Sequence, residues 1–426
     1  MEKVLTKNIR DDREPLWLAD YEAAGGYRAL RKALAEFEPQ ALTQLVKDAN
    51  LRGRGGAGFP AGMKWSFMPR FEADDPERPP YVYLVANADE MEPGTFKDRL
   101  LMEGDPHQFV ESLIISSYAI GANRCYVFLR GEYVGCARRL ERAIAEAEEA
   151  GYLGEHILGT DFSLRIRLHM SAGRYICGEE TALLSALEGK RAVPRSKPPF
   201  PAQSGLFGRP TTVNNVETLC NVPHIVLNGV DWYKSLGRHK DAGTKLFGAS
   251  GHVAKPGLVE LPLGTPLGEL IEEHFGGVRE GRALKAVLPG GGSTPMLTRE
   301  HWDTPMDFEG CGAAGSRLGT GTMVVIDETT PIVGVLKNLE QFYAQESCGW
   351  CTPCRDGLPW TARLLAGLEA GNGRPGDIDL LAMHCKFLGP GKTFCAHAPG
   401  AIGPLESALT YFRDELEALI PEVTEA

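Results

Sequence analysis

The residues with the clearest chemical signature are three cysteines spaced three apart. Cys348, Cys351 and Cys354 stand in "ESCGWCTPCR", and such a C-x2-C-x2-C run can place three thiolates around one corner of an iron-sulfur cubane. A zinc site more often uses two separated Cys or Cys/His pairs. The run therefore favours an iron-sulfur cluster over zinc, and it leaves a fourth ligand to be found.

Two later cysteines could complete this metal site. Cys385 lies in "LLAMHCKFLG", which predicts an amphipathic helix, whereas Cys395 follows the glycine-containing turn "GPGKTF". Such a turn can direct backbone N–H groups toward a sulfur-rich anion. We therefore expect Cys395 to be the fourth ligand and Cys385 to be a core thiol, with His384 and His397 as alternative ligands if the metal is zinc.

A glycine-rich loop forms the second candidate site. "GRGGAG" has Gly53, Gly55 and Gly58 at the spacing of the dinucleotide-binding fingerprint, which requires a strand before it and a helix after it. Here residues 27–51 have helical periodicity and Pro60 follows, so we do not expect a standard Rossmann turn. The loop could still close on a phosphate or a flat ring, and a simple tight turn is the plainer alternative.

Cationic and aromatic side chains follow this loop closely. Lys64 could neutralise a phosphate, although a lone lysine is more often solvated surface. Phe59, Trp65 and Phe67 could stack on aromatic rings or could belong to the core.

Polar residues collect at the predicted ends of nearby elements. The apolar run 81–86 predicts a strand buried on both faces, and ligands of open α/β sheets bind at the carboxyl ends of strands. Residues 178–180 and 214–218 stand at two predicted helix starts, where they could contact phosphate or only cap the helices. The polar candidates are Asn87, Asp89, Glu90, Glu92, Gly178, Glu179, Glu180, Asn214, Asn215 and Thr218.

The elements that must position these residues alternate between helices and strands over the first half of the chain. Apolar periodicity predicts helices within 109–121 and 136–151, a strand within 125–131, and a half-exposed strand at 164–170. The proline-rich stretch that follows predicts extended coil, and "TTVNNVETLCNVPHIVLNG" predicts a short helix.

The pattern changes twice after this α/β region. Residues 252–290 predict strand, helix and strand, with Thr265 as N-cap, Pro266 in the first helical position and Gly276 just past the end. From Thr330 onward the apolar residues recur with helical spacing, and two stripes predict helices: Ile332, Leu336, Leu339 and Tyr343, then Leu405, Leu409, Phe412, Leu416 and Leu419. We therefore expect three domains, at residues 1–239, 240–329 and 330–426.

Composition restricts the partners and the location. The formal net charge of −11 at pH 7 gives no general attraction to nucleic acid or to anionic lipid. The polar start "MEKVLTKNIRDDREP" is unlike a signal peptide, and no uninterrupted run of eighteen or more apolar residues is present. We expect a cytoplasmic protein without direct membrane insertion, whose ten cysteines are reduced.

Six stretches together resemble one family. "GRGGAGFPAGMKWSF", "NADEMEPGTFKDR", "YICGEETALL", "TTVNNVETL", "ESCGWCTPCR" and "KTFCAHAPGA", in this order, resemble the NADH-binding flavoprotein subunit of respiratory complex I, the bacterial counterpart of the mitochondrial 51 kDa subunit. The resemblance covers nearly the whole chain. It implies an α/β fold in which a Rossmann-like FMN domain is followed by a β-grasp (ubiquitin-like) module and a C-terminal helical domain with a [4Fe-4S] cluster.

The resemblance also implies roles for individual residues. The residues that would hold FMN are Gly53, Gly55, Gly56, Lys64, Asn87, Asp89, Glu90, Tyr175, Gly178, Glu179, Asn214, Asn215 and Thr218. Those that would contact NADH are Phe59, Phe67, Glu92, Glu180, Lys197 and Phe200. The cluster ligands would be Cys348, Cys351, Cys354 and Cys395, which agrees with the local reasoning.

The implied reaction is hydride transfer from NADH to FMN, followed by single-electron transfer to the [4Fe-4S] cluster and on through complex I, with no protein acid or base required. The implied partners are a thioredoxin-like [2Fe-2S] subunit and the large iron-sulfur subunit. The implied location is the inner face of the cell membrane, reached peripherally through the hydrophilic arm. A diaphorase subunit of an NAD-linked hydrogenase or formate dehydrogenase is the alternative enzyme, and a zinc-stabilised scaffold is the alternative without turnover.

Overall fold

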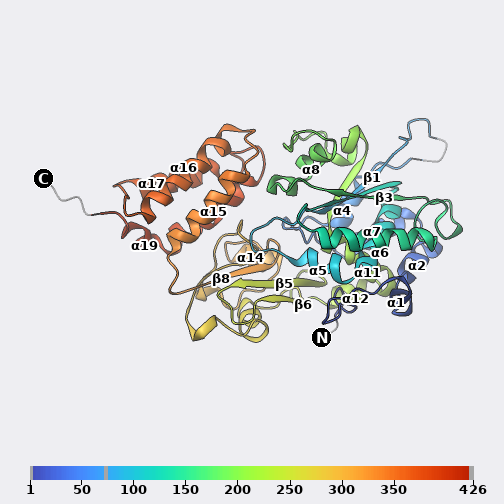
Figure 1. Cartoon of the computed structure of the whole chain (residues 1–426), viewed down its shortest axis with the longest axis horizontal. Coiled ribbons are helices and arrows are strands. Elements are labelled where there is room, and N and C mark those ends of the chain that lie inside the picture. The colour runs from blue at the N-terminus through green and yellow to red at the C-terminus, as the bar shows by residue number, and fades with distance from the viewer. Residues whose placement is uncertain (1–2, 72–74, 422–426) are drawn as a thin grey trace. The chain divides into compact units, whose positions relative to one another are not determined.

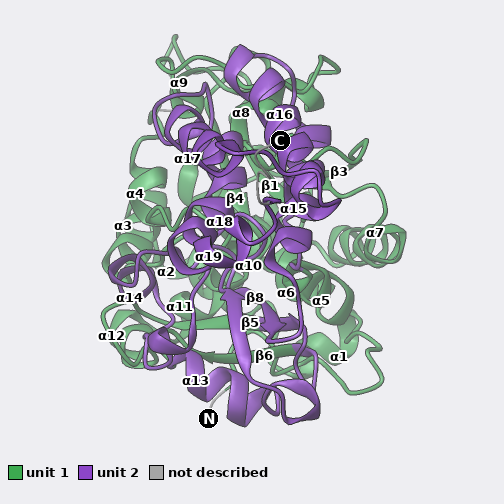
Figure 2. Ribbon diagram, turned by 90° about the vertical axis from the view of Figure 1, so that its left-hand side faces the viewer, with its two compact units in different colours: residues 1–91, 96–247, 258–265 green, residues 92–95, 248–257, 266–426 purple. Residues whose placement is uncertain are grey.

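The computed structural model describes residues 3–71 and 75–421 (Figure 1). The chain divides into two compact units, coloured separately in Figure 2. Unit 1 comprises residues 1–91, 96–247 and 258–265, and unit 2 comprises residues 92–95, 248–257 and 266–426. The three domain boundaries expected from the sequence stay a prediction.

Unit 1 is built on a four-stranded parallel sheet with the order β3-β2-β1-β4. Its strands are β1 (Tyr83–Ala88), β2 (Arg124–Leu129), β3 (Arg165–Met170) and β4 (Thr211–Asn215). The apolar β1 is buried because it lies inside the sheet, as its sequence predicts. The edge strand β3 exposes Arg165 and Arg167 and buries Ile166, which confirms the expected half-exposed strand.

Helices cover this sheet and extend from it. Helix α6 (Pro106–Ile120) is buried almost all round; Asp105 caps it by accepting from Gln108 N at 3.2 Å, and Gly121, with φ of 72°, ends it. The other helices of unit 1 are α1 (Leu18–Ala23), α2 (Arg28–Glu36), α3 (Pro39–Asp48), α4 (Ala61–Ser66), α5 (Lys97–Gly104), α7 (Val134–Glu149), α8 (Glu180–Leu187), α9 (Pro201–Ser204), α10 (Val216–Cys220), α11 (Val222–Asn228) and α12 (Val230–Ser235).

Two expectations for unit 1 are corrected. Residues 211–229 are not one short helix, because 211–215 form strand β4 before α10 and α11 begin. A strand this short has too few residues for a clear periodicity, and its parallel pairing with β1 is a long-range contact. The proline-rich stretch is not wholly coil, since it contains α9 and a 3-10 turn at Leu206–Gly208.

A second sheet has the order β6-β5-β8-β7, and β5 and β6 have residues in both units. Its strands are β5 (Thr244–Gly251), β6 (Gly257–Pro262), β7 (Leu284–Leu288) and β8 (Thr322–Asp327). The sequence predicted only two of these four strands. It also placed the helix start one residue early: α13 (Leu267–Glu269) has Pro266 as N-cap, because the Thr265 hydroxyl donates to Pro262 O instead of capping. The helix continues as a π-turn, Leu270–His274, and Gly276 follows its end as expected.

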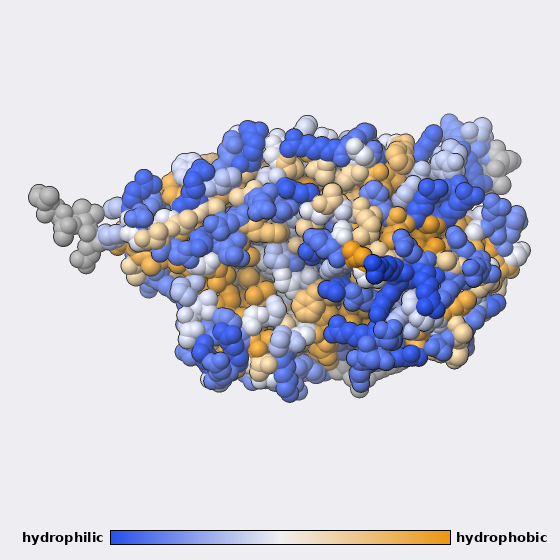
Figure 3. Space-filling view, in the orientation of Figure 1, coloured by the Kyte–Doolittle hydropathy of each residue, from blue (hydrophilic) through white to orange (hydrophobic). Residues whose placement is uncertain are grey.

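The C-terminal part of unit 2 is helical, as predicted. It contains α15 (Ile332–Glu346), α16 (Thr352–Glu369), α17 (Asp377–Leu388), α18 (His397–Tyr411) and α19 (Arg413–Glu417), after the short α14 (Phe308–Ala313). The stripe on α15 is buried; in the second stripe Leu405 and Leu416 are buried, and the helix is interrupted at Phe412. On the face drawn in Figure 3, hydrophilic and apolar residues are interspersed. No helix within residues 3–71 and 75–421 combines the length and apolar character that crossing a bilayer requires.

Candidate functional site

The glycine loop in unit 1 lies between two helices. Helix α3 precedes it and α4 follows it, which confirms that this is not a standard Rossmann turn. Gly53 N donates to Phe59 O at 3.0 Å, so the loop closes on itself. A Cβ added at Gly55 would lie 2.9 Å from Cβ of Asn215, so only glycine allows the loop backbone to approach the β4–α10 turn this closely.

Hydrogen bonds join the glycine loop and α4 to the ends of neighbouring strands. Arg54 N donates to the Thr218 hydroxyl at 2.8 Å, and Trp65 Nε1 donates to Asn214 Oδ1 at 2.9 Å. Trp65 is fully buried and is therefore a core residue, not a stacking platform. Asn87 and Asn215 are register partners at the ends of β1 and β4, so polar residues distant in sequence meet at one edge of the sheet.

The segment around β1 contributes further acidic residues. Asp89 Oδ1 accepts from the Ser171 hydroxyl at 2.9 Å. Glu90 accepts from Asp98 N at 2.8 Å and from the Tyr133 hydroxyl at 3.1 Å. Burial and the nearby Asp98 raise the pKa of Glu90 to about 7, against the opposing effect of Lys97. Glu90 is therefore expected to titrate near neutral pH.

Two adjacent glutamates at the start of α8 have different contacts. Glu179 is the N-cap: its Oε2 accepts from Thr181 N at 2.9 Å and Ala182 N at 2.8 Å, and its Oε1 lies 3.5 Å from Lys197 Nζ. Glu180 instead accepts from Lys64 Nζ at 2.6 Å and from Lys197 Nζ at 2.7 Å. Burial alone would raise the pKa of Glu180, but the two lysines lower it, so the carboxylate is ionised at neutral pH.

Three phenylalanines beside these charges are unusually exposed. Phe59, Phe67 and Phe200 are 50%, 56% and 54% exposed, and the ring centroids of Phe59 and Phe67 lie 6.4 Å apart. Exposed aromatic faces of this kind can bind a planar ring. Tyr175 begins a 3-10 turn that ends at Gly178, whose missing side chain leaves open space. Asn87 Nδ2 donates to Gly178 O at 3.2 Å and ties this turn to β1.

Sequence reasoning missed a cavity of about 550 Å³ in unit 1. Thr181, the neighbour of Glu180, lines it, as do the prolines on either side of Phe200. Glu188 and Arg195 also line it and are ion-paired at 2.9 Å. The only signal in the sequence is the dense run of prolines, which does not by itself predict a cavity.

The four predicted cluster ligands lie near the start of α16 and in the loop before α18. Cys351 is the N-cap of α16, Cys354 lies in its first turn, and Cys395 lies in the loop before α18. The pKa of Cys354 is raised to about 12 by burial and, more weakly, by the neighbouring thiols of Cys351, Cys395 and Cys348. Four clustered thiols of this kind repel one another when ionised, unless a metal compensates their charge.

The remaining cysteine and histidine candidates have other partners. Cys385 lies in α17, and its pKa is raised by burial and by Glu406 and Glu340, with no contribution from the four clustered thiols. His384 Nδ1 lies 2.8 Å from the Thr361 hydroxyl, and His397 Nε2 lies 2.8 Å from Tyr343 O. These contacts give one ring nitrogen of each histidine a partner within the protein.

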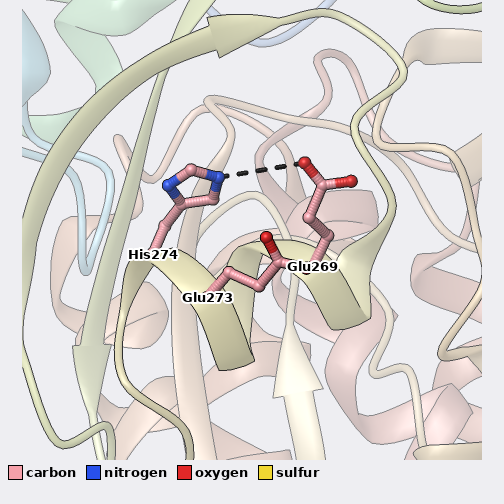
Figure 4. Close-up of side chains that lie close together, drawn as sticks. All are labelled: Glu269, Glu273 and His274. Carbon is pink, nitrogen blue, oxygen red and sulfur yellow. Dashed lines mark ion pairs between the residues drawn. The ribbon is translucent and has the colours of Figure 1, made fainter.

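Two other acidic groups lie in unit 2. Glu92 Oε1 accepts from Ser293 N at 2.7 Å, and the role of Glu92 in NADH binding stays a prediction. The side chains of Glu269, Glu273 and His274 lie close together (Figure 4), and their possible ligand atoms are within 4.8 Å of one another. The ion pair between His274 Nε2 and Glu269 Oε1, at 3.9 Å, accounts for this surface group, and we assign no metal to it.

Comparison with known proteins places these features in a family. Residues 46–224 match the Nuo51 FMN-binding domain, 245–310 the SLBB domain, and 334–419 the iron-sulfur binding region of NADH-ubiquinone oxidoreductase F. The F subunit of NADH-quinone oxidoreductase from Escherichia coli is 58% identical over 98% of this chain and 93% of its own length. The F 2 subunit of the enzyme from Rhizobium meliloti is 54% identical over 99% and 98%. The chain belongs to the family of NADH-quinone oxidoreductase F subunits.

This membership confirms the resemblance, the α/β fold with its β-grasp-like module and helical iron-sulfur region, and the cofactors FMN, [4Fe-4S] and NADH. The chain is the electron-input subunit of an NADH:quinone oxidoreductase. A solved NAD+-reducing [NiFe]-hydrogenase chain shares the fold with a TM-score of 0.83 and 35% identity over 97% of this chain and 68% of that one. The higher identity to the quinone-reducing enzymes makes the hydrogenase diaphorase the secondary alternative.

Proposed function

We propose that the edge of the parallel sheet in unit 1 binds FMN and that the adjacent exposed aromatic residues bind NADH. The observation that carries this assignment is the convergence of four chain segments: the glycine loop, the end of β1, the start of α8 and the β4–α10 turn. The FMN ligands would be Gly53, Gly55, Gly56, Lys64, Asn87, Asp89, Glu90, Tyr175, Gly178, Glu179, Asn214, Asn215 and Thr218.

The residues present fit a phosphorylated flavin. The close approach of Gly55 to Asn215 provides a glycine backbone of the kind that can approach a phosphate. Arg54, in the same loop, is fully buried, and its Nε and Nη1 atoms have no hydrogen-bond partner among the described residues. Its Nη2 atom donates to the Tyr233 hydroxyl and to Ala242 O, both at 3.0 Å, so this buried cation is only partly hydrogen-bonded within the described residues.

When bound, FMN accepts two electrons as hydride and releases them singly. The protein's own residues supply binding and orientation. Phe59, Phe67 and Phe200 would hold the flat rings of NADH by stacking, and Glu180 and Lys197 would contact its polar groups. No side chain needs to act as an acid or base, because hydride transfer moves no separate proton.

The four clustered thiols fit a metal group that holds them as thiolates. Cys348, Cys351, Cys354 and Cys395 would ligate the [4Fe-4S] cluster, and Cys385 would remain a core thiol. We further propose that this chain, as part of complex I, contacts a thioredoxin-like [2Fe-2S] subunit and the large iron-sulfur subunit. The location that follows is peripheral, on the inner face of the cell membrane, through the hydrophilic arm.

The test is the visible absorbance of the purified chain, combined with analysis of FMN, iron and zinc. We expect flavin and iron-sulfur bands, with iron and FMN in constant proportion to protein. A colourless chain that contains zinc would overturn the assignment and favour the scaffold without turnover.

A further inference from the structure

A network of buried charges underlies the β4–α10 turn of unit 1. Its members are Lys97, Asp98, Glu217 and Lys245, and none of their side chains is more than 3% exposed. Lys97 Nζ lies 2.8 Å from Asp98 Oδ1 and 2.9 Å from Glu217 Oε2, and Lys245 Nζ lies 2.8 Å from Glu217. The chain therefore keeps four charges away from water at this one place.

Pairing explains how the carboxylate of Glu217 remains ionised. Burial alone would raise the pKa of Glu217, but Lys245 and Lys97 hold it at about 2. Well-packed apolar residues are often as stabilising as buried ion pairs, so stability alone is a weak reason for such a network. Its contacts with the predicted FMN residues offer a more specific reason.

Asp98 is the member that reaches those residues. One carboxylate oxygen accepts from Asn215 Nδ2 at 2.6 Å, and the other accepts from Glu217 N at 3.2 Å. The backbone N–H of Asp98 donates to Glu90 Oε1 at 2.8 Å. Asp98 thus ties the segment at the end of β1 to the turn after β4, and these two neighbouring segments carry six of the thirteen predicted FMN ligands.

The hydrogen bond from Asn215 to Asp98 orients the Asn215 side-chain amide. Asn215 is the N-cap of α10, but its side chain makes no capping hydrogen bond and turns to Asp98 instead. The carboxylate has only acceptor atoms, so it faces Nδ2 of the amide, and Lys97 Nζ donates to Oδ1 of the same amide at 3.4 Å. The shorter contact, with Asp98, fixes which end of the amide faces the carboxylate. One of the two Nδ2 hydrogens is used by Asp98, and the other remains for a ligand.

We propose that Asp98 is a positioning residue for FMN, which orients the Asn215 amide and holds the β4–α10 turn against the end of β1. This inference rests on the proposed function, because it assumes that Asn215 contacts FMN. Asp98 itself need not touch the cofactor. Lys97 lies between Asp98 and Glu217 and pairs with both carboxylates.

The experiment measures the dissociation constant of FMN for the flavin-depleted full-length chain, from the quenching of flavin fluorescence. Asp98→Asn keeps the shape of the side chain but replaces one of its two acceptor oxygens by an NH2 group. It can then no longer accept from both Asn215 Nδ2 and Glu217 N. We expect the FMN dissociation constant to rise about ten- to hundredfold, since a hydrogen bond to a charged group is lost. Urea unfolding of each variant reports stability separately.

Asp105→Asn is the matched control. Asp105 is also a fully buried aspartate that caps the next helix, and it binds Asn8 and Gln108 rather than any predicted FMN ligand. It should lower stability at most and leave FMN affinity unchanged. If Asp98→Asn does not fold, Asp98→Glu can replace it, because it keeps the charge and displaces the carboxylate by one methylene. It should also raise the FMN dissociation constant.

A double-mutant cycle with Asn215→Ala separates positioning from general destabilisation. If Asp98 acts through Asn215, then Asp98→Asn should add little to the loss already caused by Asn215→Ala. Additive losses, or unchanged FMN affinity in a folded Asp98→Asn chain, would overturn the inference and leave the proposed function intact. Failure of the unaltered chain to bind FMN would instead overturn both.

Discussion

Replacing Glu180 by glutamine should change the choice between NADH and NADPH. NADPH carries an additional phosphate on the adenosine ribose, and a nearby carboxylate repels it while accepting a hydrogen bond from the hydroxyl of NADH. The structure adds a second effect, because Glu180 neutralises Lys64 and Lys197 at 2.6 and 2.7 Å. Glu180→Gln would therefore both remove a repulsive charge and release two cations toward the phosphate.

The size of the effect follows from the partial exposure of these groups. Two unit charges 4 Å apart interact by about 4 kcal/mol at the effective dielectric constant near a protein surface. The three side chains are 21 to 30% exposed, so solvent screening reduces the net change to about 1–3 kcal/mol. We therefore expect the ratio of kcat/KM for NADPH to that for NADH to rise roughly ten- to hundredfold, and to rise less at high salt.

The assay is steady-state oxidation of each nucleotide with ferricyanide as acceptor. Glu188→Gln is the matched control, because Glu188 lies at the other end of α8 and pairs with Lys190 and Arg195 at 2.7 and 2.9 Å. It should leave the nucleotide ratio unchanged. An unchanged ratio in Glu180→Gln, with FMN still fully bound, would mean that Glu180 only stabilises the start of α8 and that specificity is set elsewhere.

Three further outcomes are expected. Cys395→Ala should lose the paramagnetic resonance signal of the cluster while Cys385→Ala keeps it, and the reverse would exchange their roles. The isolated chain should reduce ferricyanide with NADH but should not carry out inhibitor-sensitive quinone reduction, which needs the other subunits. Glu340 is buried, with no hydrogen-bond partner for its carboxylate oxygens among the described residues, and burial raises its pKa to about 8. The Glu340 carboxyl therefore binds its proton more tightly in the folded chain than in the unfolded chain. The free energy of unfolding should fall as pH rises from about 4.5 toward 8. In Glu340→Gln, denaturant titrations should show a fall that is smaller by on the order of 3 kcal/mol.

Local pattern predicted much of the fold where the pattern was long. The helices within 27–51 and 109–121 and the buried strand near residue 83 occur within a few residues of their predicted positions. The strands β4, β5 and β8 were not predicted. Their pairing joins segments far apart in the chain, and in short segments periodicity does not distinguish a strand from a helix.

The candidate site shows the same division. Spacing alone indicated Cys348, Cys351 and Cys354, and the setting of Cys395 predicted that it, not Cys385, would join them; the structure brings these four thiols together, and their role as ligands stays a prediction. Stacking was predicted equally for Phe59, Trp65 and Phe67, but only burial shows that Trp65 belongs to the core.

The sequence by itself determined the chemistry that is available: clustered thiols, a glycine loop that is not a Rossmann turn, and a family resemblance that comparison confirmed. Only the tertiary structure decided the partners of each charged group. Glu179 and Glu180 are adjacent in sequence, yet only Glu179 caps the helix and only Glu180 pairs with both Lys64 and Lys197. Asp98 reaches Asn215 across 117 positions of the chain. Such pairings depend on which strands lie side by side, and strand order is fixed by the burial of the whole sheet rather than by any local pattern.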